Sequence, residues 1–128
     1  MMRMIGAVAA GLLLWVALEG LLQWCALLAW LDYAAAAPTR NFDLPMLVAR
    51  LLSGAGVTLL VGTAVARASG REQKAIPVFA LILLLLAVAH HLQPLVWSAY
   101  PLWYHLVFWA YLVPLTLLGG RLASARKD

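Results

Sequence analysis

Apolar positions form long runs along this chain, and the polar positions gather in short stretches between them. Four runs have about the length of a membrane-spanning helix, which needs about 20 mainly apolar residues. They cover residues 4–31, 45–66, 75–97 and 101–120. The stretches between them, DYAAAAPTRNFD, RASGREQK and a tight SAYP turn, are so short that consecutive helices have to run antiparallel. The pattern predicts an all-α fold, with one domain over residues 1–128 built as an antiparallel bundle of four transmembrane helices.

The composition supports a membrane protein. Hydrophobic residues make up 66% of the chain and charged residues 11%, whereas soluble domains have about 45–50% and 25%. The apolar excess has to face lipid, so the bilayer is the first predicted partner. The single cysteine, Cys25, excludes an internal disulfide and a CxxC-type site. Basic and aromatic residues are not interleaved as in nucleic-acid-binding proteins, and we expect no nucleic-acid partner.

The first apolar run could also be a signal peptide, because the AAAAP stretch at 34–38 resembles a small-residue cleavage site. The run is 28 residues long, however, against about 7–15 for the apolar part of a signal peptide. Glu19 and Gln23 also interrupt it. We therefore expect a retained first transmembrane helix.

The distribution of lysine and arginine predicts the orientation of the helices. Seven basic residues fall on one face of the predicted bundle: Arg3, Arg67, Arg71, Lys74, Arg121, Arg126 and Lys127. Arg40 lies clearly on the other face, and Arg50 lies just inside the second span. Because basic residues favour the cytoplasmic side of membrane helices, we expect both termini in the cytoplasm.

Small residues recur at intervals of four in the second span, at Gly54, Thr58, Gly62 and Ala66, and Arg50 continues the row outward. Small residues mark contact faces between membrane helices, so this row predicts a packing seam. The seam could serve the bundle itself or a second copy of the chain. The first span has a parallel row, Ala7, Gly11, Trp15, Glu19 and Gln23.

Glu19 lies about 18 Å below the outer end of the first span, and Arg50 lies about 8 Å below the outer end of the second. A charged side chain in the bilayer costs about 2.5–3.5 kcal/mol or more unless it turns inward and finds a partner, or, for Glu19, takes up a proton. One prediction is a direct Glu19–Arg50 ion pair. The alternative is that Arg50 extends outward to Asp43 or Asp32.

Further polar residues fall in the outer half of the predicted bundle, whereas the inner half has almost none. The whole outer cluster is Glu19, Gln23, Arg50, His90, His91, Gln93 and His105. Three interpretations stay open. The cluster could hold the helices together by hydrogen bonds, it could line a pocket for a small ligand, an ion or protons, or it could bind haem or a metal.

A haem would need His90 or His91 to face His105. Neighbouring residues point about 100° apart on a helix, so His90 and His91 cannot easily bind one metal together. We therefore predict no cofactor and no metal ligands, with haem as the minor alternative. The sequence motifs of hydrolases, metalloproteases, P-loop proteins and dinucleotide-binding enzymes are absent, so no catalytic residue is predicted.

Aromatic residues crowd the outer side, at Trp30, Tyr33, Phe42, Trp97, Tyr100, Trp103 and Tyr104. Such residues commonly form a belt at the membrane interface. An aromatic lining for a ligand cavity is the alternative.

Two resemblances add to this interpretation. Glu19 in the first of four short helices resembles the small multidrug resistance transporters, which carry an essential glutamate there. Their later tryptophan- and glycine-containing stretches are absent here, and Arg50 departs from their arginine-free second span. The stretches VGTAVARASGR (61–71) and PLWYHLVFWAYLVPLTLLGGRL (101–122) resemble small bacterial membrane proteins without an assigned activity, which implies a bacterial inner membrane.

Taken together, the sequence favours a non-enzymatic accessory or interaction protein, as a homo-oligomer or in a larger membrane complex. The first alternative is a small proton-coupled transporter or ligand-binding membrane protein that uses Glu19. The second alternative is a b-type haem or metal-binding membrane protein.

Overall fold

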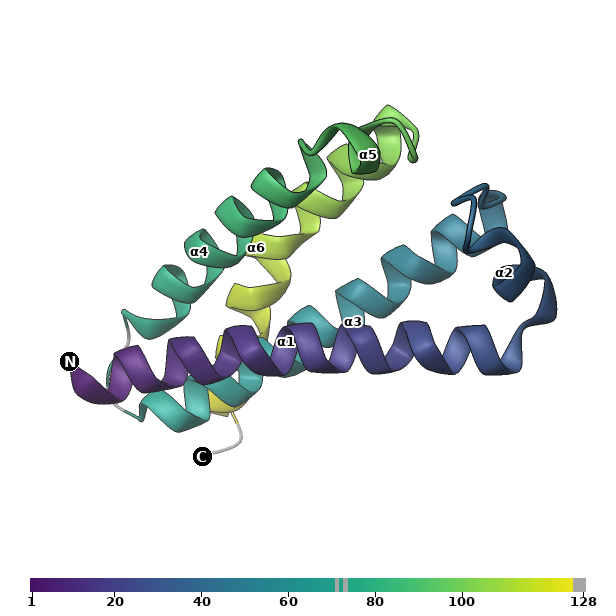
Figure 1. The fold of residues 1–128 in the computed structure, drawn as a ribbon. Coiled ribbons are helices and arrows are strands. Elements are labelled where there is room, and N and C mark those ends of the chain that lie inside the picture. Colours follow the sequence, from purple (N-terminus) through teal and green to yellow (C-terminus); the bar gives the residue numbers. More distant parts are fainter. Residues whose placement is uncertain (71, 73, 126–128) are drawn as a thin grey trace.

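The computed structural model describes residues 1–70, 72 and 74–125, and this part of the chain is helical without any strand. Its helices are α1 (Met2–Ala29), α2 (Leu31–Ala36), α3 (Leu44–Ser69), α4 (Ala75–His91), α5 (Pro94–Trp97) and α6 (Leu102–Ala125), shown in Figure 1. The prediction of an all-α fold is confirmed. Within the described residues, α1, α3 and α6 are long and apolar enough to cross a membrane. The apolar helix α4 has 17 residues and is shorter than these three.

The predicted third span, 75–97, is not one continuous helix. Helix α4 ends at His91, and Gln93 has an extended backbone with φ −61° and ψ 134°. Pro94 explains the break, because proline lacks an amide hydrogen and disfavours the helical conformation of the residue before it. The carbonyl of Gln93 instead accepts the amides of Val96 and Trp97, which starts the short helix α5.

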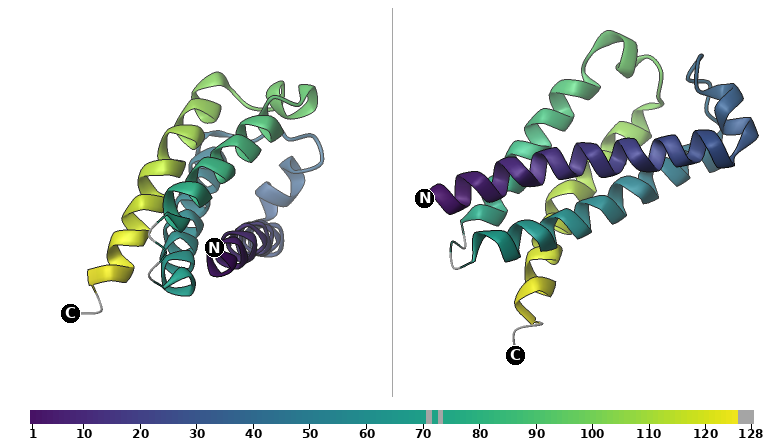
Figure 2. Two further views of the ribbon diagram at one scale, coloured as in Figure 1. Left: turned by 90° about the vertical axis from the view of Figure 1, so that its left-hand side faces the viewer. Right: turned by 60° about the horizontal axis from the view of Figure 1, so that its bottom comes forward.

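The predicted first span, 4–31, also ends early. Trp30 is extended, with φ −125° and ψ 100°, and separates α1 from α2. Helix α2 begins at Leu31, the last residue of the predicted first span, and continues into the segment that the sequence predicted as a loop. The chain therefore turns by two short helices, α2 and α5, at the ends of two hairpins (Figures 1 and 2).

Helices α3 and α6 form the most extensive contact, and they run parallel to each other. Gly54 packs against Tyr111, and Gly62, two turns later, packs against the backbone of Thr116. The contact positions thus increase together along both helices. A Cβ added at Gly62 would lie 2.7 Å from the carbonyl oxygen of Thr116, so the backbones touch.

The same contact continues at Gly119 of α6. A Cβ there would lie 2.5 Å from the carbonyl oxygen of Leu59 and 2.8 Å from the amide nitrogen of Thr63. The hydroxyl of Thr63 also donates a hydrogen bond to the carbonyl of Gly119, at 3.1 Å. Close backbone approach and such interhelical hydrogen bonds are the main attractive forces between helices in lipid.

The small-residue row of the second span lies between helices of one molecule. Gly54 and Gly62 face α6, whereas fully buried Thr58 accepts a hydrogen bond from the indole of Trp15 on α1, at 3.0 Å. Ala66 at the inner end is half-buried.

Helix α1 approaches both α3 and α4 in its N-terminal half. At Gly11 an added Cβ would contact Val65 of α3 and lie 3.1 Å from the ring of Phe79 on α4. From this crossing α1 and α4 diverge toward α2 and α5 (Figures 1 and 2). The two hairpin tips are therefore spread apart.

The beginning of α1 and the end of α6 lie at the opposite end of the molecule from α2 and α5 (Figure 1). The terminal amine of Met1 forms an ion pair with Glu72, at 3.0 Å, in the segment between α3 and α4. The basic residues Arg3, Arg67, Lys74 and Arg121 belong to the helix ends and the connection on this side. Arg71, Arg126 and Lys127 of the predicted basic face lie outside the described residues.

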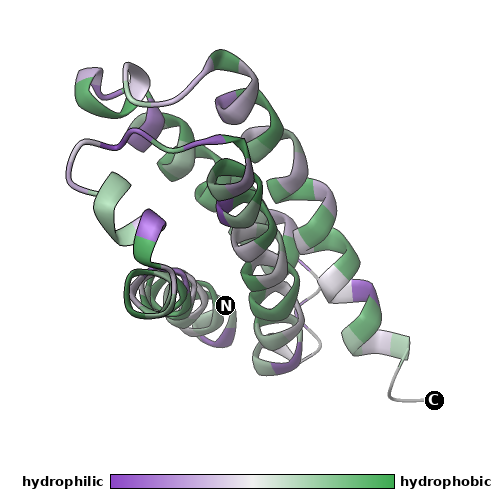
Figure 3. Ribbon diagram, turned by 90° about the vertical axis from the view of Figure 1, so that its right-hand side faces the viewer, coloured by the Kyte–Doolittle hydropathy of each residue, from purple (hydrophilic) through white to green (hydrophobic). Residues whose placement is uncertain are grey.

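The outer surfaces of the helices are strongly apolar. Figure 3 shows hydrophobic residues along the helix bodies and hydrophilic residues mainly near helix ends and loops. Leu13, Leu28 and Leu52 are 74%, 72% and 67% exposed. In water this surface would be unfavourable, whereas lipid chains solvate it well.

Candidate functional site

Glu19 faces the interior of the bundle, on the side of α1 that contacts α3. One carboxylate oxygen, Oε1, accepts hydrogen bonds from the amide of Gln23, at 2.9 Å, and from the hydroxyl of Ser53, at 3.2 Å. The other oxygen, Oε2, is buried without a hydrogen-bond partner among the described residues. The structure therefore places Glu19 among other helices, with half of its hydrogen-bonding capacity unused.

Arg50 does not form the direct pair with Glu19 that the sequence suggested. Its Nη1 donates to the carboxamide oxygen of Gln23, at 2.7 Å, and to the hydroxyl of Tyr33, and its Nε donates to Tyr104, at 3.4 Å. Gln23 thus lies between the two charges, since its amide nitrogen donates a hydrogen bond to Glu19 and its carboxamide oxygen accepts one from Arg50. Within the described part of the chain, the terminal amine and Glu72 form the sole ion pair.

The alternative in which Arg50 extends outward to Asp43 or Asp32 is also not what the structure has. The carboxylate of Asp43 caps α3 by accepting the amide of Met46, at 3.0 Å, and Asp32 is exposed in α2. Arg50 instead lies over aromatic rings, 5.0 Å from the centre of Phe42 and 5.4 Å from that of Tyr100. Such cation–π contacts contribute about 0.5–2 kcal/mol each and stabilise a buried guanidinium without a carboxylate.

These rings belong to a stacked series that crosses between the hairpins. Tyr33 stacks on Phe42 at 5.0 Å, Phe42 on Tyr100 at 6.0 Å, and Tyr100 on Tyr104 at 4.7 Å between ring centres. Tyr33 and Tyr104 are only 2% and 4% exposed. Tyr33 and Tyr104 therefore face the interior of the protein, as in the alternative of an aromatic lining.

Other aromatic residues of the set do face outward. Trp97 and Trp103 are 41% and 40% exposed, as an interfacial position allows, and Trp30 is half-buried between α1 and α2.

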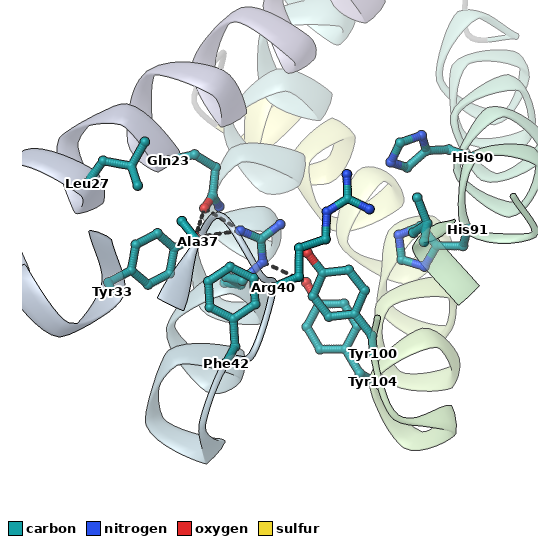
Figure 4. Close-up of a pocket in the computed structure, with 12 residues that line it drawn as sticks. Gln23, Leu27, Tyr33, Ala37, Arg40, Phe42, His90, His91, Tyr100 and Tyr104 are labelled. Carbon is teal, nitrogen blue, oxygen red and sulfur yellow. Dashed lines mark hydrogen bonds between the residues drawn. The ribbon is translucent and has the colours of Figure 1, made fainter. Parts of the chain in front are cut away.

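A cavity of ≈ 280 Å³ lies between the two hairpin tips, and we call it the tip cavity. It is lined by Gln23, Leu27, Tyr33, Ala37, Arg40, Phe42, Arg50, His90, His91, Val96, Tyr100 and Tyr104. Figure 4 shows Gln23 and Tyr33 on one side of it and His90 and His91 on the other. Two of the lining side chains are arginines, and none is a carboxylate. The tip cavity is therefore electropositive.

Arg40 joins the two hairpins across this cavity. Its Nη1 donates to the carbonyl of Leu95 in α5, at 3.2 Å. Arg40 also has a positive φ of 54°, a conformation that costs about 1–2 kcal/mol for a residue with a Cβ. The chain thus holds a strained arginine at the mouth of an already cationic cavity.

Tyr100 lies in the connection between α5 and α6. Burial raises its pKa above the ordinary value, although the nearby guanidiniums of Arg50 and Arg40 act in the opposite direction. The hydroxyl of Tyr100 therefore keeps its proton at neutral pH and is available as a hydrogen-bond donor.

His91 and His105 form a buried pair, with 2.9 Å between their Nδ1 atoms. The Nε2 of His105 lies 3.3 Å from the carbonyl oxygen of Trp97, which can only accept, so this nitrogen carries a proton. In neutral His105 the Nδ1 is then an acceptor, and His91 has to donate from its own Nδ1. It follows that neutral His91 has an unprotonated Nε2, which can accept a hydrogen bond.

The haem arrangement does not fit this pair. Two imidazole nitrogens on opposite sides of one metal ion lie roughly 4 Å apart, because each metal–nitrogen bond is about 2.0–2.1 Å. The observed 2.9 Å between Nδ1 atoms of His91 and His105 is a hydrogen-bond distance. Among the described residues no group of three or more His, Cys, Asp or Glu side chains is placed to hold a metal ion.

The remaining two members of the predicted cluster are more peripheral. His90 is exposed and lines the cavity from α4, next to His91. Gln93 is exposed, and its part in the structure is the backbone cap of α5. The structure therefore brings Glu19, Gln23 and Arg50 into one network and His91 and His105 into another, and leaves the side chain of Gln93 outside both.

Sequence reasoning missed Ser53, Arg40 and the roles of Tyr33 and Tyr104. Ser53 had a signal, because it lies three residues after Arg50 and so shares its side of α3. The contacts of Tyr33 and Tyr104 with Arg50 depend on how the two hairpin tips fold back, so no signal in the sequence indicated them.

A second cavity of ≈ 490 Å³ lies between α1 and α4, and we call it the apolar cavity. Its lining consists of Leu12, Trp15, Val16, Glu19, Gly20, Gln23, Leu83, Leu86, Ala87, His90, His91 and Phe108. Most of these side chains are apolar, and Glu19, Gln23, His90 and His91 lie toward one end of it.

Comparison of the chain with protein-family models, with curated proteins and with solved structures gives no match.

Proposed function

We propose that the chain is an integral membrane protein of four spans that binds a small anionic ligand in the tip cavity. The cavity supplies donors from two arginines and several tyrosines and has no lining carboxylate. Guanidinium groups are well suited to phosphate and carboxylate because their donors match both oxygens of such anions.

The observation that carries this proposal is the incomplete pairing of Arg50. Its hydrogen bonds use Nε and Nη1, and Nη2 makes none among the described residues. Its bonding partners are uncharged side chains, and the carboxylate of Glu19 reaches it only through Gln23, so the largely buried guanidinium has no directly paired counter-charge. A bound anion would provide it. For this reason we favour ligand binding over the accessory role that the sequence suggested, which repeated co-purification of one partner in mild detergent would test.

The parallel packing of α3 and α6 supports the proposal of four spans. If both helices cross the membrane in the same direction, the segment between them has to return across it. Helix α4 is the long helix in that segment, and 17 residues is at the lower end of the length range for a span. The basic helix ends next to the termini favour a cytoplasmic location for both termini, in a bacterial inner membrane.

Thiol labelling tests this topology. In a Cys25→Ala background, Ala68→Cys and Ser98→Cys place single thiols before and after α4. We expect an impermeant maleimide added to intact cells to label Ser98→Cys, and to label Ala68→Cys only after permeabilisation. Labelling of both variants from the same side would refute the fourth span.

Calorimetric titration tests ligand binding, with glycerol 3-phosphate as the probe and the purified protein in neutral detergent. We expect saturable binding that weakens with added salt. A hydrogen bond to a charged group contributes about 1.5–3 kcal/mol, so Arg50→Gln should weaken binding by about tenfold or more. Arg50→Lys keeps the charge, so its affinity should lie between that of the unchanged protein and that of Arg50→Gln.

Arg67→Gln is the matched control, because it removes the same charge at the opposite end of α3, where Arg67 is exposed. The proposal fails if no saturable binding occurs, or if Arg50→Gln and Arg67→Gln have equal effects on the affinity.

A further inference from the structure

We infer that the ligand is a single-chain anionic amphiphile, with its headgroup in the tip cavity and its hydrocarbon chain in the apolar cavity between α1 and α4. This inference rests on the proposed function and names the chemical class of its ligand.

The first argument is that the two cavities are neighbours with a shared wall. Gln23, His90 and His91 line both of them. A single molecule can therefore occupy both, with its polar part among the arginines and its apolar part on the other side of these three residues.

The second argument is the chemistry and direction of the apolar cavity. Along α1 its lining runs from Gln23 back to Leu12, about 17 Å of helix at 1.5 Å per residue. On α4 it is walled by Leu83, Leu86 and Ala87. The cavity thus runs along the helices from the tips toward the middle of the predicted bilayer, which is the direction of a lipid chain whose headgroup lies at the interface.

The third argument is size. At ≈ 490 Å³ the apolar cavity falls within the range of about 300–1,000 Å³ that is typical of small-molecule sites. Val16 of α1 and Leu86 of α4 line this cavity and are exposed on the outside of the protein, so a chain can enter between the two helices from the surrounding lipid.

Glu19 adds a specific feature at the junction. It lines the apolar cavity, and its buried Oε2 has no hydrogen-bond partner among the described residues. Glu19 lies one helical turn below Gln23, which binds Arg50. A hydroxyl or amide N–H placed just below an anionic headgroup would complete the hydrogen bonding of this carboxyl group.

The experiment compares oleoyl-lysophosphatidate, which has one chain, a phosphate and a free hydroxyl, with glycerol 3-phosphate. We expect the lipid to bind more tightly by on the order of tenfold or more, because its chain is buried. The analogue of the lipid that lacks the hydroxyl should bind about tenfold less tightly than the lipid itself.

Gly20→Trp separates the chain site from the headgroup site. Gly20 lines the apolar cavity, is exposed, and has nothing within 4 Å of an added Cβ, so the substitution fills the cavity without a backbone clash. Gly56→Trp on α3 is the matched control, since Gly56 also has open space and lines neither cavity. We expect Gly20→Trp to abolish the advantage of the lipid and to leave glycerol 3-phosphate binding intact, and Gly56→Trp to change neither.

The outcomes distinguish the two proposals. If both compounds bind equally, or Gly20→Trp leaves the lipid affinity unchanged, the amphiphile is refuted while anion binding stands. If neither binds, both proposals fail. If Gly20→Trp instead halves the particle mass in light scattering, the face between α1 and α4 is an interface between copies of the chain, which also overturns the inference.

Discussion

The tight backbone contact between α3 and α6 makes Gly62→Ala a quantitative test of the fold. The added methyl group would lie 2.7 Å from the carbonyl oxygen of Thr116 and 3.1 Å from its Cα, and ordinary contacts begin at 3.4 Å. Because these are backbone atoms, no side chain can rotate away, and α6 has to move by about 0.7 Å. Overpacking of this kind costs about 1–3 kcal/mol.

A gain in helix propensity offsets part of this cost. Replacing glycine by alanine within a helix favours folding by about 0.5–1 kcal/mol. We therefore expect Gly62→Ala to lower the free energy of unfolding by about 1 kcal/mol, and by about 2.5 kcal/mol at most. The assay is reversible unfolding by SDS in mixed micelles, followed by far-UV circular dichroism.

Gly56→Ala is the matched control on the same helix, because an added Cβ there meets nothing within 4 Å. It should leave stability unchanged or raise it slightly. Gly119→Ala, on the other side of the contact, should resemble Gly62→Ala. If Gly62→Ala unfolds at the same SDS fraction as Gly56→Ala, the parallel backbone contact between α3 and α6 is refuted.

Two further hydrogen bonds between helices give predictions for the same assay. Trp15→Phe removes the 3.0 Å bond to Thr58 and should cost about 1 kcal/mol, whereas Trp24→Phe at a 60% exposed position should cost much less; equal losses would contradict this packing of α1. His105→Phe leaves its buried partner His91 without its 2.9 Å bond and should cost about 1–3 kcal/mol. The double variant with His91→Phe should regain part of that loss, and simple additivity of the two single losses would argue against the pair.

The helices could be predicted because their causes are local. Each long apolar run has to satisfy its backbone hydrogen bonds within itself in lipid, and only a helix does so for a single segment. The break at Pro94 also had a local cause, but the predicted third span ran through it because apolar length set the bounds of that span. The apolar length of residues 75–97 hid a proline whose effect on Gln93 is a matter of backbone sterics.

The candidate site could be predicted only as a set of residues. The sequence grouped these polar residues in one half of the predicted bundle, and the rows on α1 and α3 suggested that Glu19 and Arg50 lie on contact faces, where the structure places them. Their pairing was wrong, since the carboxamide of Gln23 lies between them and the guanidinium is held by Tyr33 and Tyr104.

The sequence by itself determined that the chain is helical, that its outer surfaces are apolar, and that its basic residues concentrate at one end. These properties depend on spacing and composition along single segments. Only the tertiary structure decided that α3 and α6 run parallel in backbone contact, that two hairpin tips spread apart, and that Arg40 and Arg50 line one cavity. The reason is that contacts between side chains of different helices depend on the rotation, tilt and depth of each helix, and residue spacing within one helix specifies none of these.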